Sequence, residues 1–584
     1  MRMLAGYPLA IEVVLANLAR QSVAQVLAGL DIGDGGLDRA GGKTESILKC
    51  VEYSHSNLSE EAQKLLLCLA PFSGFVRRDI LGLYAQELQN LEPFRDYAFE
   101  QFDAAVQEAI NWGLLAPMFE RMPHLLSIQP IFPYFLKMKL TDQHETTREA
   151  FREGFRNHYL GLANSYHQLM KSQDAQQQQI GLFFCKLEYE NLYNALRICL
   201  ERQESISIFG CLDKYFESVH NTQSALLLAK EVCQAVEEYP EAWKIDRNND
   251  QYVVALNLLA YCYLQTKQYT EAQQMYKKEI EVREVIGDRH SQAITYHQLG
   301  RVAEELHEFE QARNYYQQAL QIKIEFNDRY SQASTYHQLG IFSQKLREFK
   351  QARIYYQQAL QIYEEFNNRY SQASTYHQLG IVAQELRQYE EAHANYQQAL
   401  QIRIEFNDRY SQASTYQNLG RLAEELREFE QARTYYQQAL QIKIEFNDRY
   451  SQGSTYHSLG IIAYMMREYE QARSDYQQAL RIYAEFNDGY EQAGTYHSLG
   501  TVAQELHEYE QARSDYQQAL QIYEEFNARY EQASTHHNLG LLAEAEGNAV
   551  EARANYQQAL ERYVEFGDDY WGNIVREAID RLSD

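Results

Sequence analysis

One short motif has residue types that bind phosphate groups. Residues 36–46 read GLDRAGGKTES, and Gly42, Lys43 and Thr44 match the end of the loop that cradles nucleotide phosphates. The full pattern, GxxxxGK[ST], needs a glycine at position 37, where this chain has leucine. The preceding stretch is typical of a helix end and a loop, not of the strand that such a motif follows. We therefore expect no nucleotide hydrolysis by this chain, no catalytic residues and no cofactor.

Histidines form a second chemical pattern, because they recur every 40 residues in the C-terminal half. They are His297, His337, His377, His457, His497 and His537, with Gln417 in the remaining place. Packed helices lie roughly 8–10 Å apart, whereas the ligands of one zinc ion all lie about 2 Å from it. Histidines at one per helix pair are too widely spaced to share a metal ion, so we expect no metal site. We expect them instead to titrate near pH 6.5 and to offer donors and acceptors to a bound peptide.

These histidines belong to an internal repeat of fixed length. Blocks of 40 residues align without a gap over 251–570, as the near-identity of 371–410 and 411–450 shows. A fixed period of this size is typical of a solenoid, in which each unit buries its apolar face against its neighbours. Within 291–330, apolar and small residues recur at three- and four-residue spacing in two runs, which predicts two helices joined by a short break at 307–309.

The residues at these spacings resemble the signature of the tetratricopeptide repeat. In the block 291–330 they are Tyr296, Leu299, Gly300, Phe309, Ala312, Tyr316 and Ala319. The longer period makes the units similar to those of kinesin light chains and related adaptors. The resemblance implies an all-α fold, a right-handed α-solenoid of helix pairs, with eight repeats over 251–570 and a capping helix over 571–584. The glycine is expected to let the two helices of a pair approach closely, because it lacks a Cβ.

Differences between the blocks indicate where a partner could bind. Solenoids of this family line their concave groove with the first helix of each pair, so its variable positions are candidate contacts. The position of Lys323 in the second helix also varies, among Lys, Tyr and Arg. Neutral drift at exposed positions is the alternative explanation of this variation. The predicted partner-binding residues are His297, Arg301, Glu304, Glu305, His337, Gln344, Lys345, His377, Gln384, Glu385, Arg421, Glu424, Glu425, His457, Tyr464, Met465, His497, Gln504 and Glu505.

The composition restricts the class of partner. The chain has 584 residues and a formal net charge of −27, which disfavours binding to nucleic-acid phosphates. Its seven cysteines form no CxxC pair and leave one over, which fits a reducing compartment. The apolar stretch at 10–19 is interrupted by Glu12 and Asn17 and is shorter than a membrane span. We expect a soluble, cytoplasmic protein that binds neither nucleic acid nor membranes.

The first part of the chain has a different resemblance. The segment LAGYPLAIEVVLANLA, with Gly6 and Pro8, resembles the GxP segment of STAND and NB-ARC signalling ATPases. Helical patterns and a predicted hairpin around 120–123 resemble the winged helix that follows the ATPase core in that class. A histidine commonly precedes the proline near the end of that domain, whereas this chain has Gln129. The resemblance places Gly6, Pro8 and Gln129 near the nucleotide, and the missing histidine puts nucleotide sensing in doubt.

The resemblance also implies a division of this part into domains. Residues 1–40 are expected to be a remnant of the ATPase helical subdomain, and 41–140 the winged-helix domain. Residues 141–250 are expected to form a helical linker with degenerate repeat-like helices.

Together these patterns predict an interaction protein and not an enzyme. The solenoid would hold a peptide or protein partner in its concave groove, as the ligand-sensing part of a STAND-type switch. Because the chain lacks a complete phosphate loop, we expect the ATPase core to be encoded upstream or on another chain, and that core is a second candidate partner. The alternative is a stand-alone adaptor or scaffold without nucleotide-linked switching.

Overall fold

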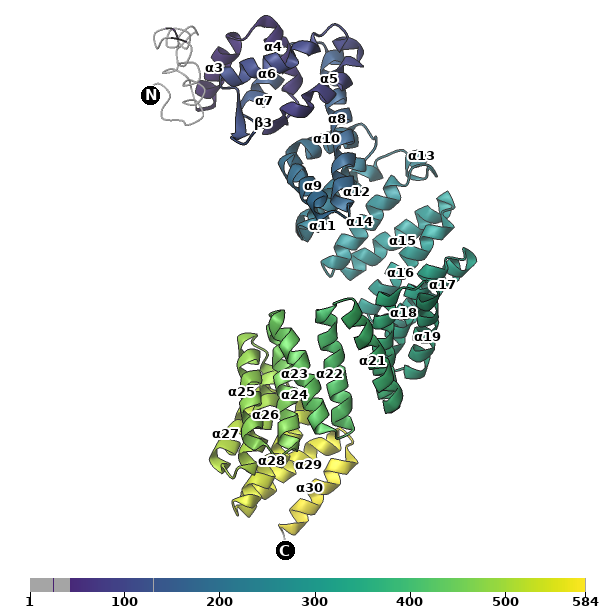
Figure 1. The fold of residues 1–584 in the computed structure, drawn as a ribbon, viewed down its shortest axis with the longest axis vertical. Helices are drawn as coiled ribbons and strands as arrows, with labels where there is room; N and C mark the ends of the chain where they lie inside the picture. Colours follow the sequence, from purple (N-terminus) through teal and green to yellow (C-terminus); the bar gives the residue numbers. More distant parts are fainter. Residues whose placement is uncertain (1–20, 22–24, 26–42, 130, 583–584) are drawn as a thin grey trace. The chain divides into compact units, whose positions relative to one another are not determined.

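The computed structural model describes Gln21, Gln25 and residues 43–129 and 131–582, most of them in helices. The chain divides into two compact units, Met1–Ile322 and Lys323–Asp584. The expected fold class is confirmed, because a long series of helix pairs follows a part that carries a small β-hairpin (Figure 1). Among the helices that are described, none combines the length and the apolar character needed to span a bilayer.

The first unit begins with helices around a small antiparallel sheet. Strand β3 is central, with β1 on one side and β2 on the other, so a third strand extends the predicted hairpin. Leu115 pairs with Ile128 in this hairpin, and Phe119 pairs with Met122 next to the turn. The elements are α3 (Lys43–Ser56), α4 (Glu60–Leu66), β1 (Phe75–Arg77), α5 (Leu81–Gln89), α6 (Phe102–Asn111), β2 (Leu115–Phe119), β3 (Met122–Ile128) and α7 (Ile131–Leu140), with short 3-10 turns at Leu67–Leu69, Arg78–Ile80, Glu92–Phe94 and Phe99–Gln101.

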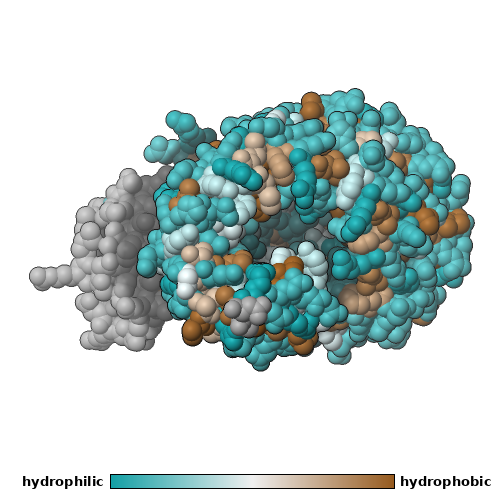
Figure 2. All heavy atoms as spheres, turned by 90° about the horizontal axis from the view of Figure 1, so that it is seen from below, coloured by the Kyte–Doolittle hydropathy of each residue, from teal (hydrophilic) through white to brown (hydrophobic). Residues whose placement is uncertain are grey.

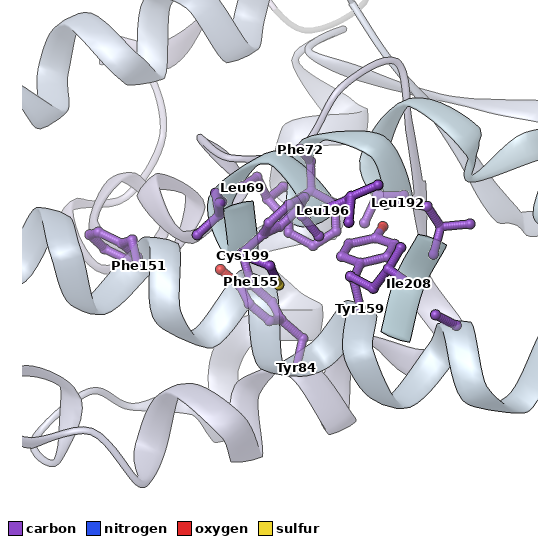
Figure 3. Close-up of a cluster of buried hydrophobic side chains, with 14 of the residues drawn as sticks. Leu69, Phe72, Tyr84, Phe151, Phe155, Tyr159, Leu192, Leu196, Cys199 and Ile208 are labelled. Atoms are coloured by element: carbon purple, nitrogen blue, oxygen red, sulfur yellow. The ribbon is translucent and has the colours of Figure 1, made fainter. Parts of the chain in front are cut away.

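One aromatic core joins this sheet-containing part to the helices that follow. The Phe72 ring meets Tyr84 edge-on at 5.1 Å between centroids and meets Phe155 of α8 at 5.0 Å (Figure 3). Leu192 and Leu196 of α10 belong to the same buried cluster. The helices of this region are α8 (Glu145–Lys171), α9 (Ala175–Leu187), α10 (Tyr189–Glu201), α11 (Ser207–Ser218), α12 (Thr222–Glu237), α13 (Glu241–Lys244), α14 (Gln251–Gln265), α15 (Tyr269–Ile286), α16 (Arg289–Glu305) and α17 (Phe309–Glu325), whose end belongs to the second unit.

The second unit repeats one pair of antiparallel helices. The first helices of the pairs are α18 (Arg329–Lys345), α20 (Arg369–Glu385), α22 (Arg409–Glu425), α24 (Arg449–Met465), α26 (Gly489–Glu505) and α28 (Arg529–Ala545). The second helices are α19 (Phe349–Glu365), α21 (Tyr389–Glu405), α23 (Phe429–Glu445), α25 (Tyr469–Glu485), α27 (Tyr509–Glu525) and α29 (Ala549–Glu565), and α30 (Asp569–Arg581) closes the chain.

A polar side chain fixes the start of most first helices. Asp448 Oδ1 accepts a hydrogen bond from the Ser451 backbone N–H at 3.2 Å, as an N-cap does. Its Oδ2 accepts a second bond, at 3.2 Å, from the Tyr410 hydroxyl of the preceding repeat. The cap therefore also ties neighbouring repeats together. Ala528 stands in this place before α28, where the side chain makes no capping bond.

The repeat glycine allows a tyrosine ring to pack against the first helix. A Cβ placed on Gly380 would lie 2.5 Å from the ring of Tyr396, which is fully buried. The close approach expected at this position is therefore confirmed, and the ring of the second helix is what makes it necessary.

The terminal helix α30 shows how the array ends. Val575 and Ala578 are buried against the last repeat. Trp571 of this helix is 39% exposed. Its ring lies over His537 and Tyr563 at 5.6 and 6.4 Å between centroids. The indole thus covers part of the last pair while one side stays exposed.

Candidate protein-binding surface

The first helices of the second unit lie on the inner side of the stack. Alternate first helices contact each other, as in the pairs α18 and α20, α20 and α22, and α26 and α28. In the described part of this unit, no two second helices approach as closely. The exposed side of the first helices, which we call the inner face, is therefore the narrow side of the array, while the second helices form its wide side.

Four positions in each first helix form the inner face. In α22 they are Ser414, Asn418, Arg421 and Glu425, whose spacing of four, three and four residues places them on one side of a helix. None of the equivalent positions in α18, α20, α24, α26 and α28 is buried. A partner that lies along the first helices would meet these side chains first.

Several predicted site residues lie on this face. Met465 is 53% exposed, and its position is exposed in every first helix of the second unit. Arg301 and Glu305 of α16, in the first unit, are also exposed. The remaining predicted residues of this class are Lys345, Glu385, Arg421, Glu425 and Glu505, all of them exposed.

A second series of predicted site residues, at the position of Gln384, instead forms hydrogen bonds between the two helices of each pair. Gln384 is buried and accepts a hydrogen bond from the hydroxyl of Tyr396 at 3.0 Å. The residues Glu304, Gln344, Glu424 and Gln504 accept the equivalent bond from tyrosines of their second helices. Their variation between Glu and Gln preserves an acceptor for the buried hydroxyl. Tyr464 takes this place in α24 and contacts Tyr469 at a tilt, with ring centroids 5.7 Å apart.

The predicted histidines lie behind the inner face, not on it. The ring of His337 meets Tyr356 of its own repeat at 5.3 Å between centroids, and its Nδ1 lies 3.1 Å from Thr375 Oγ1 of the next repeat. His497 makes the equivalent contact to Thr535, also at 3.1 Å. His457 and His537 likewise lie against tyrosines of their own second helices, and His297 does so in the first unit. The rings of His337 and His497 thus help to join their repeats to the next ones.

The expectation of titration near pH 6.5 is wrong for His337, His377, His457 and His497. Burial lowers the pKa of His337, His457 and His497 to about 4. Burial and the nearby charges of Arg403 and Arg421 lower the pKa of His377 to about 3. The rings are therefore neutral at physiological pH, because the next repeat removes them from water. Direct contact of these rings with a peptide stays a prediction.

The variable position of the second helix is also buried. Lys323, Arg403 and Lys443 are each less than a tenth exposed, and Tyr363, Tyr483, Tyr523 and Tyr563 fill the same place in other repeats. Lys443 Nζ donates to Thr455 Oγ1 at 2.6 Å, to Gln417 Oε1 at 3.1 Å and to the Ser451 carbonyl at 3.2 Å. Burial lowers the pKa of this ammonium group to about 8. The switch among Lys, Arg and Tyr therefore takes place in the interior, and these side chains are not themselves part of the exposed surface.

Sequence reasoning missed one series that does line the inner face. It consists of Gln338, Gln378, Asn418, Ser458, Ser498 and Asn538, which are all partly exposed. These residues lie three positions before the Arg421 series, and their change from Gln to Asn to Ser was visible in the aligned repeats. Asn418 and Lys443 line a pocket of about 210 Å³, together with Tyr410, Ala413, Ser414, Gln417, Asp448 and Ser451.

Polar groups dominate the visible surface. Figure 2 shows one face of the molecule as mostly hydrophilic, with apolar residues in small scattered groups. The inner-face positions agree with this pattern, because most of them carry amide, hydroxyl or charged groups. A partner there would be recognised largely by hydrogen bonds and charges.

The nucleotide-proximal residues expected from the first part are only partly described. Gly6 and Pro8 lie outside the described residues. Gln129 is buried, and its carbonyl accepts a hydrogen bond from the Phe132 N–H at 2.8 Å at the start of α7. Among the described residues, no group of His, Cys, Asp or Glu side chains could hold a metal ion.

A cavity of about 600 Å³ lies in the first unit beside α7, α8 and α10. Its charged lining residues have both signs, and many are already paired, as in Arg152 with Glu201. This mixed lining gives no clear preference for an anion or a cation.

Comparison with known proteins agrees with the repeat geometry. The family model of the tetratricopeptide repeat matches residues 251–325, 331–405, 371–445, 411–485 and 491–565, which together cover more than half of the chain. The chain therefore belongs to the tetratricopeptide-repeat family. A search of curated proteins gives no match.

Several solved structures resemble the chain at low sequence identity, and the first of them shares its fold. A STAND protein with a tetratricopeptide repeat sensor from Pyrococcus horikoshii matches 84% of this chain and 68% of its own, with 16% identity and a TM-score of 0.53. BtubC (BKLC) from P. vanneervenii matches 43% of this chain and 92% of its own, with 18% identity and a TM-score of 0.33. A putative kinesin light chain of Podospora anserina matches 34% of this chain and 93% of its own, with 16% identity and a TM-score of 0.30.

Proposed function

We propose that this tetratricopeptide-repeat protein binds an extended peptide or a protein surface along the inner face of its repeat array. One observation carries the proposal: the positions of Asn418, Arg421 and Glu425 on the inner face are at least partly exposed and differ between repeats. Selection for stability alone would not diversify these positions in preference to the exposed position of Gln357 and Gln437 on the wide side.

The first unit suggests the context in which such binding acts. We propose that 41–140 is a winged helix of the STAND class, preceded by a remnant of the ATPase helical subdomain, and that 141–250 links it to the repeats of 251–570. The shared core around Phe72 supports a mechanical connection between the sheet-containing part and the linker. The likeness to the Pyrococcus horikoshii structure supports the same order of parts. On this proposal, partner binding shifts the population of two switch states.

Cross-linking with mass spectrometry tests the binding proposal. The full chain is used as bait in an extract of its own cells, and cross-links to captured proteins are mapped. The proposal predicts that most cross-links leave α18, α20, α22, α24, α26 and α28 from lysines or acidic residues of the inner face. Cross-links confined to the second helices would contradict it.

Nucleotide dependence separates the switch from the stand-alone adaptor. If the chain serves a STAND switch, an ATPase core should be among the captured partners, and its capture should differ between ADP and a non-hydrolysable ATP analogue. An adaptor captures the same partner to the same extent with either nucleotide.

A further inference from the structure

A buried polar layer behind the inner face differs between repeats in a way that affects the surface. At the layer position, which is that of Lys443, the repeats have Lys323, Tyr363, Arg403, Lys443, Tyr483, Tyr523 and Tyr563. Each of these side chains is buried, and Arg403 and Lys443 contact His377 and Gln417 of their own repeats. His377, Gln417, His457 and His497 in turn contact the inner-face residues Asn418, Ser458, Ser498 and Asn538 of the next repeats.

In repeats with tyrosine in the layer, the hydrogen bonds determine which ring nitrogen carries the proton. Thr535 Oγ1 lies 2.9 Å from the Glu531 carbonyl, to which its hydroxyl can donate. With the single hydroxyl proton on that carbonyl, His497 Nδ1, which lies 3.1 Å from the same oxygen, is the donor of the second bond. Nε2 of the neutral ring is then an acceptor. It faces Asn538 Nδ2 at 3.1 Å, which leaves the amide oxygen of Asn538 for a partner.

His337 repeats this arrangement in another tyrosine layer. Its Nδ1 lies 3.1 Å from Thr375 Oγ1, and the Thr375 hydroxyl donates to the Ser371 carbonyl at 2.9 Å. The proton therefore resides on Nδ1 here as well.

In the repeat with Arg403 the same argument gives the opposite tautomer. The guanidinium group has only donors, and its Nη1 lies 3.2 Å from His377 Nδ1. Nδ1 must therefore accept, and the proton of the neutral ring moves to Nε2. Asn418 Nδ2 lies 3.1 Å from this Nε2, so a half-turn of the amide brings its oxygen to the ring. That half-turn leaves the NH₂ group of Asn418 for a partner.

In the repeat with Lys443, the histidine is replaced by Gln417, whose amide has no tautomers. Its hydrogen bonds run in the same direction as those inferred for His377. Lys443 Nζ donates to Gln417 Oε1 at 3.1 Å. Gln417 Nε2 then donates to Ser458 Oγ on the inner face at 3.3 Å. The amide oxygen of Gln417 thus faces the Lys443 ammonium group as an acceptor, and its NH₂ group faces the inner face as a donor.

We propose that the buried layer residue sets the hydrogen-bonding polarity of the inner face above it. This inference rests on the proposed function, because polarity matters only if a partner lies there. Above Arg403, the inner face presents the NH₂ group of Asn418 beside the exposed guanidinium of Arg421, and it fits a partner's acceptor oxygen, either a carboxylate or a backbone carbonyl. Above Tyr523, it presents the amide oxygen of Asn538 and fits a donor.

The tautomers can be measured without any partner. In the perdeuterated full chain with ¹³C-labelled histidine, the Cδ2 chemical shift distinguishes a ring protonated at Nδ1 from one protonated at Nε2. Single histidine-to-glutamine variants assign the signals. We expect His337 and His497 to be protonated on Nδ1 and His377 on Nε2. The same tautomer at His377 and His497 would overturn the proposal.

Variants at the layer position test whether the layer residue determines the histidine tautomer. Arg403→Tyr introduces the residue of the neighbouring repeats and should move the His377 proton to Nδ1, whereas the matched control Arg403→Lys keeps a donor and should leave it on Nε2. If Arg403→Tyr does not fold, Tyr523→Lys asks the same question in reverse, with His497 expected to change to Nε2. If the tautomers of His377 and His497 stay the same in the Arg403→Tyr and Tyr523→Lys variants, the layer residue does not determine them.

Selection of peptides tests the consequence for binding. A phage-displayed library of random peptides is selected on the full wild-type chain, on Arg403→Lys and on Arg403→Tyr. Peptides from the first two should lose affinity for Arg403→Tyr by about tenfold or more, since one donor has become an acceptor. An Asp-to-Asn or Glu-to-Gln change in the peptide weakens binding if the oxygen is a carboxylate and leaves it unchanged if it is a backbone carbonyl. Equal affinity for all three chains would overturn the proposal.

Failure of the underlying function gives a different result. If no chain selects any peptide while the tautomers are as expected, the proposed function of the groove is wrong although the internal polarity is correctly assigned.

Discussion

The two units of this protein are stabilised in different ways. In the first unit, one large cluster of aromatic and aliphatic side chains, which includes Phe72, spans the sheet-containing part and helices α8 to α14. In the second unit, small separate clusters recur in each repeat, such as the one around Tyr396. A single core couples distant segments, whereas a chain of small cores couples only neighbours. A single core suits a part that transmits a conformational change between segments. A chain of small cores suits an extended surface for binding.

The largest expected effect comes from the core of the first unit. Phe72→Ala should lower the free energy of unfolding of this unit by about 3–5 kcal/mol, because it leaves a cavity among packed rings. Hydrogen exchange should show faster amide exchange from α5 to α10, with α22 to α29 unchanged. Phe406→Ala, which removes a side chain that is 53% exposed, is the matched control and should change little. Equal loss of protection in both units would show that they do not differ in this way.

The buried histidines should make the second unit sensitive to acid. A base whose pKa falls on folding binds a proton more readily in the unfolded chain, so stability decreases as the pH falls from about 6.5 toward 4. His497→Gln, which copies the natural Gln417, should flatten this dependence by at most about 1.4 kcal/mol per pH unit. Denaturant unfolding at several pH values measures the slope. An unchanged slope would show that the ring is not buried in its neutral form.

Two glycines of the second unit should respond to the same substitution with opposite sign. Gly380→Ala places a Cβ against the ring of Tyr396 and should cost about 1–3 kcal/mol. At Gly494, an added Cβ would meet only the Tyr523 hydroxyl, at 3.6 Å. Gly494→Ala should therefore stabilise its helix by up to about 1 kcal/mol through higher helix propensity. Thermal unfolding of both variants provides the measurement, and destabilisation by both would contradict the packing described here.

The smallest expected effect is the repair of a missing cap. Ala528→Asp introduces the side chain that caps most of the other first helices and should stabilise the second unit by about 1 kcal/mol. Asp448→Ala removes an existing cap and should cost a similar amount, with the added loss of the bond from Tyr410. If Ala528→Asp gives no gain while Asp448→Ala is destabilising, the stabilisation comes from the tyrosine bond and not from capping.

The periodic sequence made most of the second unit predictable. The fixed period and the small residues at the Gly380 position indicated helix pairs without any knowledge of their packing. Strand β1 was not predicted, because three residues are too few to show an alternating pattern. Its place in the sheet depends on pairing with β3, which follows about 50 residues later in the chain.

The candidate site was predictable only at its exposed positions. The Arg421 and Met465 series follow from helix spacing. The Gln384 series was assigned to the groove because nothing local reveals that the tyrosine twelve residues later donates to it. The histidine pKa values could not be foreseen either, because the burial that lowers them comes from the following repeat.

The most direct test of the central claim compares the two sides of the array. Affinity for a partner captured by the full chain is measured for the inner-face variant Ser414→Glu with Met465→Glu and for the wide-side variant Gln357→Glu with Gln437→Glu, which adds the same charge at exposed positions. We predict a loss of about tenfold or more for the inner-face variant alone, because charged carboxylates would replace its contacts. An unchanged affinity for the inner-face variant, or an equal loss for both, would contradict binding along the inner face.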